Sequence, residues 1–384
     1  MKQETFCSLP FSEIFLGADG GIRPCCSMRG DFGNINQSNL VDILNGTIAQ
    51  SVKTSIINGE WHPNCSQCQE LESLGGRTER QGTLIDFDRF KNYTATDFTL
   101  EKLDLRWSNT CNLSCNYCYE YFSSQWANIK GIKVNANKPS AEDSIFAFIE
   151  NNKDKITNIN LLGGEPLLQK PNIKLLNLVP DSYYYILTNL STEIEGNKLA
   201  EQLLSNSKVS WGISFETVGK RFEYVRNGAD WNRLVHNLRL LNHHKVPNID
   251  VHPLYCIYSA FNLCEFYEFL EGEGYFNNIY WQLLQNIKGL DIFRSPKSLK
   301  IKAIAELELC ISRYEDKFNM DLLKNIHKKV VDSLSDQQGY TTIEHAKWLD
   351  ELNGQIPNKK SSFIELWPNI YQEIINLQYA SDTI

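Results

Sequence analysis

From about residue 100 onward, short apolar runs alternate with longer stretches in which apolar residues recur every three to four positions. The short runs are rich in β-branched and aromatic residues, which is typical of buried parallel strands. Six strands are expected, at Lys102–Trp107, Ile156–Leu162, Tyr183–Thr188, Val209–Phe215, Ile249–Ile257 and Asn278–Leu283. The longer stretches predict helices, which include Ala141–Asn151, Lys198–Ser205, Trp231–His243 and Leu263–Glu273.

This alternation predicts the α/β class with a parallel sheet. Right-handed crossovers curl such a sheet toward a barrel, and six units in place of eight favour a partial (β/α)6 TIM-like barrel. In barrels of this kind the chemistry lies at the C-terminal ends of the strands. Functional residues are therefore expected directly after the predicted strands.

The segments on either side of this core have different patterns. Residues 1–80 are loop-rich, with many Gly, Asn and Ser residues, and they predict a single helix around Leu40–Ile57. Near the C-terminus, apolar positions recur at helical spacing through Ile301–Tyr314 and again through Phe363–Leu377, which predicts helices there. We expect three parts, a loop-rich module at 1–95, the barrel core at 100–290 and a helical tail at 291–384.

Composition and charge narrow the classes of function. Hydrophobic residues make up 42% and charged residues 22% of the 384 residues, which is ordinary for a globular protein. The net charge of −8 argues against a nucleic-acid partner, because phosphate-binding surfaces are basic. The sequence shows neither a signal peptide nor an apolar run of about 20 residues, so we expect no membrane association and a cytoplasmic location.

The cysteines give the first indication of chemistry. Eight of the eleven cysteines lie before residue 120. Disulfides rarely persist in the cytosol, so clustered cysteines there indicate metal or redox chemistry. Cys256, Cys264 and Cys310 stand apart, and we interpret them as small buried hydrophobic residues.

Three cysteines follow the first predicted strand with the spacing C-x3-C-x2-C, namely Cys111, Cys115 and Cys118. Three thiolates on one short loop can bind three irons of a [4Fe–4S] cluster and leave the fourth iron open for a bound molecule. A structural zinc site is the alternative, although such sites usually have paired C-x2-C units or added histidines.

This motif resembles the signature of the radical S-adenosylmethionine superfamily. The resemblance implies that the open iron chelates S-adenosylmethionine through its amino and carboxylate groups. Cleavage of the cofactor by an electron from the cluster would then yield a 5′-deoxyadenosyl radical, which abstracts hydrogen from a substrate. The triplet cysteines would be both the metal ligands and the catalytic residues.

Further positions match this family in chain order. Gly163–Pro166 is similar to the family's GGEP motif and follows the second predicted strand, where glycines allow a close approach of backbone to a ligand. Carboxylate and guanidinium groups suit the charged ends of an amino acid. The resemblance implies a set of cofactor contacts, namely Tyr117, Gly163, Gly164, Glu165, Pro166, Thr188, Asn189, Ser214, Glu216 and Arg226.

Each of these positions also has a plainer interpretation. GGEP alone is compatible with an ordinary turn. Glu216 and Arg226 are equally compatible with solvated surface charges. Tyr117, expected near the adenine ring, is also compatible with ordinary packing.

The N-terminal cysteines form a second set, in which four thiolates would enclose one cluster completely, namely Cys7, Cys25, Cys65 and Cys68. Cys26 is an alternative ligand to Cys25. The set resembles the twitch and SPASM extensions of the same superfamily, which implies a second, auxiliary [4Fe–4S] cluster. In the family this extension normally follows the barrel, whereas here it precedes it. A four-cysteine zinc site is the alternative.

The resemblance implies an enzyme, and relatives with this extension commonly modify peptides or proteins. It also implies a reducing partner such as flavodoxin or ferredoxin. One alternative is a radical oxidoreductase or epimerase acting on a carbohydrate or another small molecule, with Cys256 or Cys264 as a hydrogen donor. The alternative without catalysis is an iron–sulfur or zinc-binding scaffold.

Overall fold

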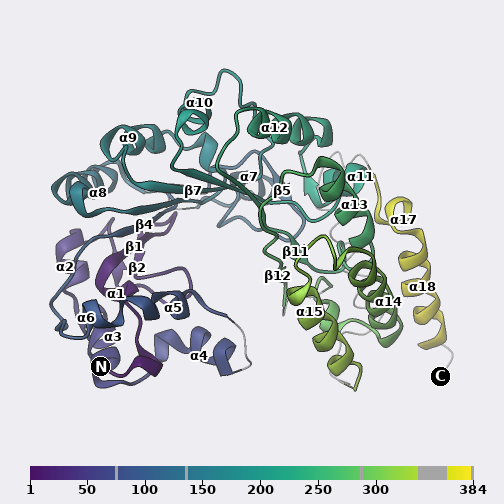
Figure 1. Ribbon diagram of the computed structural model, residues 1–384, viewed down its shortest axis with the longest axis horizontal. Coiled ribbons are helices and arrows are strands. Elements are labelled where there is room, and N and C mark those ends of the chain that lie inside the picture. The colour runs from purple at the N-terminus through teal and green to yellow at the C-terminus, as the bar shows by residue number, and fades with distance from the viewer. Residues whose placement is uncertain (74–76, 135–136, 286, 288, 336–360, 382–384) are drawn as a thin grey trace. The chain divides into compact units, whose positions relative to one another are not determined.

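The computed structural model describes the chain except for residues 74–76, 135–136, 286, 288, 336–360 and 382–384 (Figure 1). It divides into two compact units. Unit 1 comprises residues 1–111, 120–188 and 195–210. Unit 2 comprises residues 112–119, 189–194 and 211–384.

The centre of unit 1 is a parallel sheet whose strands follow one another in chain order. β4 (Lys102–Leu105) pairs with β6 (Asn158–Leu161), which pairs with β7 (Tyr183–Thr188). The chain then reaches β8 (Val209–Ile213) beside β7, where the Tyr184 N–H donates to Lys208 O (2.8 Å). Tyr184 is also a buried member of the core, at 2% exposure. The predicted α/β class with a parallel sheet is confirmed.

The sheet of unit 1 also continues beyond β4 into the N-terminal segment. β1 (Glu13–Leu16) pairs in parallel with β4, and β2 (Gly21–Arg23) and β3 (Gly33–Asn34) follow in antiparallel order. Gly20 makes the turn between β1 and β2 with φ = 88°, a conformation that favours glycine. These short strands were not predicted, because few apolar residues alternate within them.

The helices of unit 1 largely agree with the predictions. The single helix expected around Leu40–Ile57 is wrong, because α2 (Leu40–Leu44) ends at Asn45 and α3 (Thr47–Asn58) begins after Gly46. The remaining helical elements are η1 (Gln3–Thr5), α1 (Leu9–Ser12), η2 (Pro63–Cys65), α4 (Ser66–Ser73), α5 (Glu79–Gly82), η3 (Thr83–Asp86), α6 (Phe87–Phe90), α7 (Ser124–Lys130), α8 (Pro139–Asn152), η4 (Lys153–Lys155), η5 (Pro166–Leu168), α9 (Pro171–Leu178) and α10 (Lys198–Ser205).

Unit 2 contains the last residues of β8 and the neighbouring strand β10 (Asn248–Val251). The His252 N–H, just after β10, donates to Ile213 O at the end of β8 (2.8 Å). The single strand predicted at Ile249–Ile257 is interrupted, because Pro253 has no N–H for the ladder. This segment therefore pairs in parallel with the predicted sixth strand at two separate places. Val251 forms a bridge with Ile279, and β11 (Leu254–Tyr255) pairs with β12 (Gln282–Leu283).

The C-terminal part of unit 2 is helical where it is described. The predicted helix at Phe363–Leu377 is divided at Trp367, since Pro368 starts a new helix. The helical elements of unit 2 are α11 (Gly219–Val225), α12 (Trp231–His243), α13 (Leu263–Glu273), η6 (Ile292–Arg294), α14 (Lys297–Tyr314), α15 (Asp321–Asp332), η7 (Ser333–Ser335), α17 (Phe363–Leu366) and α18 (Pro368–Ser381). Among the described helices, none has the length and apolar character needed to cross a membrane.

A buried asparagine connects the end of β4 to the segment after β6. Asn172 is fully buried, accepts a hydrogen bond from Trp107 Nε1 (2.8 Å) and donates to Pro166 O (2.9 Å). The Trp107 ring stacks on Phe146 with centroids 5.1 Å apart. Asn172 thus fixes the position of Pro166, the last residue of the GGEP sequence, relative to the strand that precedes the cysteine triplet.

We predict that Asn172→Ala lowers the free energy of unfolding by about 2–4 kcal/mol, because it leaves a buried N–H and a buried C=O unpaired. The measurement is the urea midpoint, followed by circular dichroism under anaerobic conditions. The matched control is Asn177→Ala, which changes an exposed residue of the same helix. Equal midpoints for the two variants would contradict the assigned role of Asn172.

Candidate functional site

The cysteine triplet lies on the loop after β4. Cys111 belongs to unit 1 and residues 112–119 belong to unit 2, and hydrogen bonds hold the loop within each unit. In unit 1 the Cys111 N–H donates to Ser124 Oγ, and the Ser124 hydroxyl donates to Cys111 O, both at 3.1 Å. In unit 2 the Cys118 N–H donates to Cys115 O (2.9 Å). There, β5 (Ser114–Cys115) also pairs antiparallel with β9 (Arg226–Asn227).

The thiols of this loop are largely removed from water. Cys111 and Cys115 are 9% and 8% exposed, and Cys118 is half-buried. Burial raises the pKa of Cys115 to about 11, although the nearby Arg226 charge acts to lower it. A buried thiol of this kind becomes a thiolate when a metal ion binds it. The chemistry of the donors therefore fits an iron–sulfur cluster.

The GGEP loop packs closely against the backbone that precedes the triplet. A Cβ on Gly164 would lie 2.3 Å from Thr110 O, and one on Gly163 would lie 2.5 Å from Gln169 Nε2. Gly163 also has φ = 115°. Gly164 is therefore required by the close approach of the Thr110 backbone, and Gly163 by that of the Gln169 side chain. The Glu165 N–H also donates to Thr110 O (2.8 Å).

Two residues from different strand ends meet at the GGEP glutamate. The Glu165 side chain is fully buried and accepts hydrogen bonds from Thr188 Oγ1 (2.6 Å) and from the Leu167 N–H (3.1 Å). Thr188 ends β7, and Glu165 follows β6. The structure therefore brings together these two predicted site residues and fixes the orientation of the carboxylate.

Asn189 and Ser214 follow the ends of neighbouring strands. In unit 2, Asn189 Nδ2 donates to Asn112 Oδ1 (2.9 Å), which links this strand end to the residue after Cys111. Ser214 lies directly after β8 and is partly exposed. Both side chains thus lie in the region after the strands, as the sequence predicts.

A buried ion pair lies beside the triplet in unit 2. Arg226 Nη2 and Glu216 Oε2 are 2.7 Å apart, and their side chains are 5% and 0% exposed. The Tyr117 hydroxyl lies 3.3 Å from both carboxylate oxygens, and the Arg226 guanidinium lies 5.5 Å from the Tyr117 ring centroid. The interpretation of Glu216 and Arg226 as solvated surface charges is therefore wrong.

The electrostatics of this pair favour an additional ligand. Burial acts to lower the pKa of Arg226, but the Glu216 carboxylate raises it, so the guanidinium remains charged. Arg226 Nε is buried and has no hydrogen-bond partner among the described residues. A buried donor without a partner is costly, so an acceptor from a bound molecule would stabilise it.

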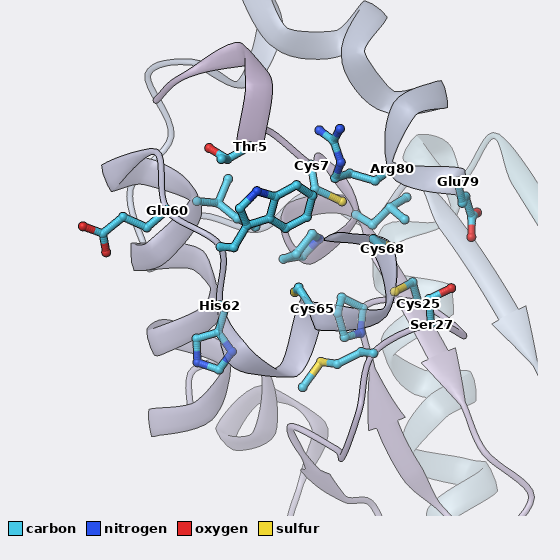
Figure 2. Close-up of a pocket in the computed structure, with 16 residues that line it drawn as sticks. Thr5, Cys7, Cys25, Ser27, Glu60, His62, Cys65, Cys68, Glu79 and Arg80 are labelled. Atoms are coloured by element: carbon cyan, nitrogen blue, oxygen red, sulfur yellow. The ribbon is translucent and has the colours of Figure 1, made fainter. Parts of the chain in front are cut away.

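The N-terminal cysteines surround one buried cavity in unit 1, and Figure 2 shows them together. Cys7 precedes α1, Cys25 follows β2, Cys65 ends η2 and Cys68 lies in α4. All four line the cavity, together with six apolar and six polar or charged residues. Burial raises the pKa of each of these thiols, and that of Cys65 reaches about 11. Four sulfurs around one enclosed space fit a cluster with four cysteine ligands.

The structure distinguishes Cys25 from Cys26. Cys25 lines the cavity, whereas Cys26 is not among the lining residues and its side chain is exposed. Desolvation raises the pKa of Cys26 to about 11, and the charges of Glu79, Asp104 and Arg106 also act on it, which places its thiol near the polar face of β4. The geometry therefore favours Cys25 as the ligand.

An arginine beside the cavity was missed by the sequence analysis. Arg80 is 6% exposed, pairs with Glu72, and donates from Nη1 to Phe6 O (2.7 Å). Its guanidinium lies 5.0 Å from the Trp61 ring centroid and acts to lower the pKa of Cys7 and Cys68. A cation next to these sulfurs would stabilise the charge of a thiolate-ligated cluster. No sequence signal marks Arg80, because it follows Cys68 at no recognised spacing.

Of the remaining cysteines, Cys256 lies close enough to Tyr117 and Glu216 for their charges to interact, whereas Cys264 of α13 and Cys310 of α14 lie beside each other. Cys256 and Cys310 are fully buried, and Cys264 is half-buried with its thiol within hydrogen-bonding reach of Cys310. Over the part of the chain that is described, no three or more His, Cys, Asp or Glu side chains are arranged to hold one metal ion. Cysteines of a four-iron cluster each bind a different iron, so they need not converge on one point.

Comparison with protein families gives two matches on these segments. Residues 105–271 match the radical SAM superfamily, and residues 7–69 match the SPASM family, described as an iron–sulfur cluster-binding domain. The first range contains the triplet, the GGEP loop and the Glu216–Arg226 pair. The second contains the four cysteines of the cavity.

A curated relative matches a shorter stretch of the chain than the radical SAM model does. A 7-carboxy-7-deazaguanine synthase of Clostridium acetobutylicum is 39% identical over 134 residues, which are 35% of this chain and 46% of that protein. The chain thus spans about half the length of this curated relative.

Among solved structures, native anSMEcpe with bound AdoMet and the Cp18Cys peptide has a TM-score of 0.41 at 15% identity, covering 56% of this chain and 61% of that one. Streptococcus suis SuiB bound to the precursor peptide SuiA has a TM-score of 0.41 at 14% identity, covering 75% and 64%. TM-scores this low do not establish a shared fold.

The cofactors of the two matched families are those that the cysteine groups fit. The radical SAM range includes the three-cysteine loop, and the SPASM range includes the four-cysteine cavity. Residues 105–271 of this chain therefore form a radical SAM superfamily domain, whose cofactors are a [4Fe–4S] cluster and S-adenosylmethionine, and residues 7–69 form an iron–sulfur cluster-binding domain of the SPASM family that precedes it.

Proposed function

We propose that this protein reductively cleaves S-adenosylmethionine and abstracts a hydrogen atom from a substrate. The observation that carries the proposal is the radical SAM match over a range that contains Cys111, Cys115 and Cys118 at C-x3-C-x2-C spacing. When bound, the cluster supplies the electron that releases a 5′-deoxyadenosyl radical from the cofactor. A one-electron donor such as flavodoxin or ferredoxin would supply that electron.

The chain's own residues would bind and orient the cofactor. Glu165, held by Thr188, presents an oriented carboxylate that suits an amino group. Arg226, with its unpartnered Nε, suits a carboxylate and lies close to Cys115 through the β5–β9 pairing. The other proposed contacts are Tyr117, Gly163, Gly164, Pro166, Asn189, Ser214 and Glu216.

The N-terminal module would hold the auxiliary [4Fe–4S] cluster on Cys7, Cys25, Cys65 and Cys68. Enclosure by four cysteines leaves no open iron, which suits electron transfer or structural support. We further propose that residues 1–95 form this module, residues 100–290 the core and residues 291–384 a helical tail. An auxiliary cluster would accept or return an electron after hydrogen abstraction.

We propose a peptide or protein as the substrate, on the association of the SPASM-type module with peptide modification. A small-molecule substrate is the second candidate. The stretch of 39% identity to 7-carboxy-7-deazaguanine synthase favours it, because that protein's name describes a small-molecule product. In that case the enzyme would be a radical oxidoreductase or an epimerase.

We expect anaerobically reconstituted protein to form 5′-deoxyadenosine from S-adenosylmethionine with dithionite, and Cys115→Ala to form none, because its cluster lacks one of three ligands. The product is measured by liquid chromatography with mass spectrometry. The control is Cys264→Ser, which changes a half-buried cysteine on α13. Activity in Cys115→Ala would overturn the proposal, and inactivity of the wild type would favour a binding scaffold.

Cys65→Ala should lower the iron and sulfide content by about four each per chain, since the auxiliary cluster loses one of its four cysteines. Cys26→Ala should keep the iron and sulfide contents of the wild type, because the Cys26 side chain lies outside the cavity. Elemental analysis and sulfide determination measure the result. Zinc in place of iron in this module, or equal losses in both variants, would contradict the assignment.

Arg226→Gln is expected to lower the free energy of unfolding by about 3–5 kcal/mol, because it leaves the Glu216 carboxylate buried without its partner. Adding Glu216→Gln removes that charge and should restore most of the stability. We expect S-adenosylmethionine to bind at least tenfold more weakly to the double variant than to the wild type, as measured by equilibrium dialysis. Wild-type affinity in a folded double variant would exclude Arg226 from the cofactor site.

A further inference from the structure

Two arginines from distant parts of the chain lie against the same aromatic ring in unit 1. The guanidinium carbon of Arg106 is 4.5 Å from the Phe15 ring centroid, and that of Arg23 is 5.2 Å from it. Phe15 is 3% exposed, whereas the two arginine side chains are 18% and 23% exposed. The ring is therefore buried beneath two guanidinium groups that still reach solvent.

Strand register explains why these residues meet. Phe15 of β1 lies opposite Arg23 of β2 and opposite Asp104 of β4. Arg106 is two residues beyond Asp104, and its backbone N–H continues the ladder by donating to Leu16 O (3.0 Å). Side chains two residues apart on a strand point to the same face. Arg106 and Asp104 therefore share the sheet face on which the Phe15 ring lies.

Each arginine is oriented by one carboxylate and has donors left over. Arg106 donates through Nε and Nη2 to the two oxygens of Asp104 (3.1 and 3.2 Å). Arg23 donates through Nε to Asp31 (2.5 Å). Across the described residues, Arg106 Nη1 and both terminal nitrogens of Arg23 donate no hydrogen bond. A guanidinium fixed along one edge presents its other edge to a ligand with little loss of conformational entropy.

The carboxylates around the two arginines determine the net charge of this face, and the charge of Asp19 also acts on Arg23. Asp104 and Asp31 compensate the two guanidinium groups, so the cluster persists without a ligand. The remaining N–H groups of each guanidinium can donate hydrogen bonds to the oxygens of a carboxylate or phosphate. The Phe15 ring supplies a cation–π contact to both arginines and restricts their movement.

The position of the arginines places this face next to both candidate cofactor sites. A Cβ on Gly163 of the GGEP loop would lie 3.4 Å from Arg106 Cα. Arg23 ends β2, and Cys25 of the cavity follows two residues later. An anion bound by the two arginines would thus lie on the face of unit 1 that adjoins the GGEP loop and the N-terminal cysteine module.

We propose that Arg23 and Arg106, held against Phe15, bind a carboxylate or phosphate group of the substrate. This inference rests on the proposed function, because it assumes that the enzyme acts on a substrate. Binding of the anion itself can be measured without turnover. For a peptide substrate the bound group would be an acidic side chain, a C-terminal carboxylate or a phosphate. For a small molecule it would be an acidic substituent.

The test is isothermal titration of the reconstituted protein with succinate in one arm and inorganic phosphate in the other. We expect at least one probe to bind the wild type, and at least a tenfold weaker affinity in the Arg23→Gln/Arg106→Gln double variant. The matched control is Arg239→Gln, because Arg239 is also paired with one carboxylate through Nε and Nη2 but lies on α12. The arm that binds identifies carboxylate or phosphate as the preferred group.

A second measurement covers the case in which the double variant fails to fold. In the wild type, phenylglyoxal labelling of Arg23 and Arg106, located by mass spectrometry, should decrease at least threefold in the presence of the binding probe, while labelling of Arg239 stays constant. Failure of both probes to bind the wild type, equal binding by the folded double variant, or unprotected Arg23 and Arg106 would each overturn the inference. None of these outcomes depends on 5′-deoxyadenosine formation, whose absence would overturn the proposed function alone.

Discussion

The antiparallel pairing of Ser114–Cys115 with Arg226–Asn227 is the contact on which the candidate cofactor site of unit 2 depends. Leu113 of the cysteine loop is buried, at 1% exposure, and hydrogen bonds fix the course of the backbone around it. The pairing is reinforced by the Asn116 N–H, which donates to Val225 O (2.8 Å), and by Asn116 Nδ2, which donates to Tyr224 O (3.0 Å). Because the same short ladder carries Cys115 and Arg226, a proposed metal ligand and a buried cation are positioned by one element.

Burial imposes a second constraint on both groups of cysteines. The pKa values of Cys115 and Cys65 are raised to about 11 by desolvation, so the thiols stay protonated at neutral pH without a metal. Binding of iron would replace those protons and recover the free energy that the buried sites cost. The N-terminal module is rich in loops and short helices, so cluster binding would contribute directly to its folding. Arg80 moderates the cost by placing a buried positive charge near Cys7 and Cys68.

The sequence predicts those parts of the fold in which a local pattern decides the structure. β7, α10, α12 and α13 have the predicted bounds, because each combines a clear apolar period with a cap or turn. Boundaries were wrong where one residue overrides the period, as Gly46 does between α2 and α3 and Pro253 does between β10 and β11. The strand residues Glu13–Leu16 were missed, since their stability comes from pairing with β4, about 90 residues away in sequence.

The same distinction applies to the sites. Cysteine spacing and the GGEP sequence are local signals, so they could be recognised without a structure. The exclusion of Cys26 from the cavity and the mutual pairing of Glu216 with Arg226 depend on tertiary contacts, and no spacing rule contains them. The contact of Arg23 and Arg106 with Phe15 is the extreme case, because it exists only through the unpredicted extension of the sheet by β1 and β2. Once β1 is placed beside β4, the pleat alone brings the Phe15 ring and the Arg106 side chain to one face, and strands of the cysteine-rich module join the sheet that contains β6, the strand before the GGEP loop.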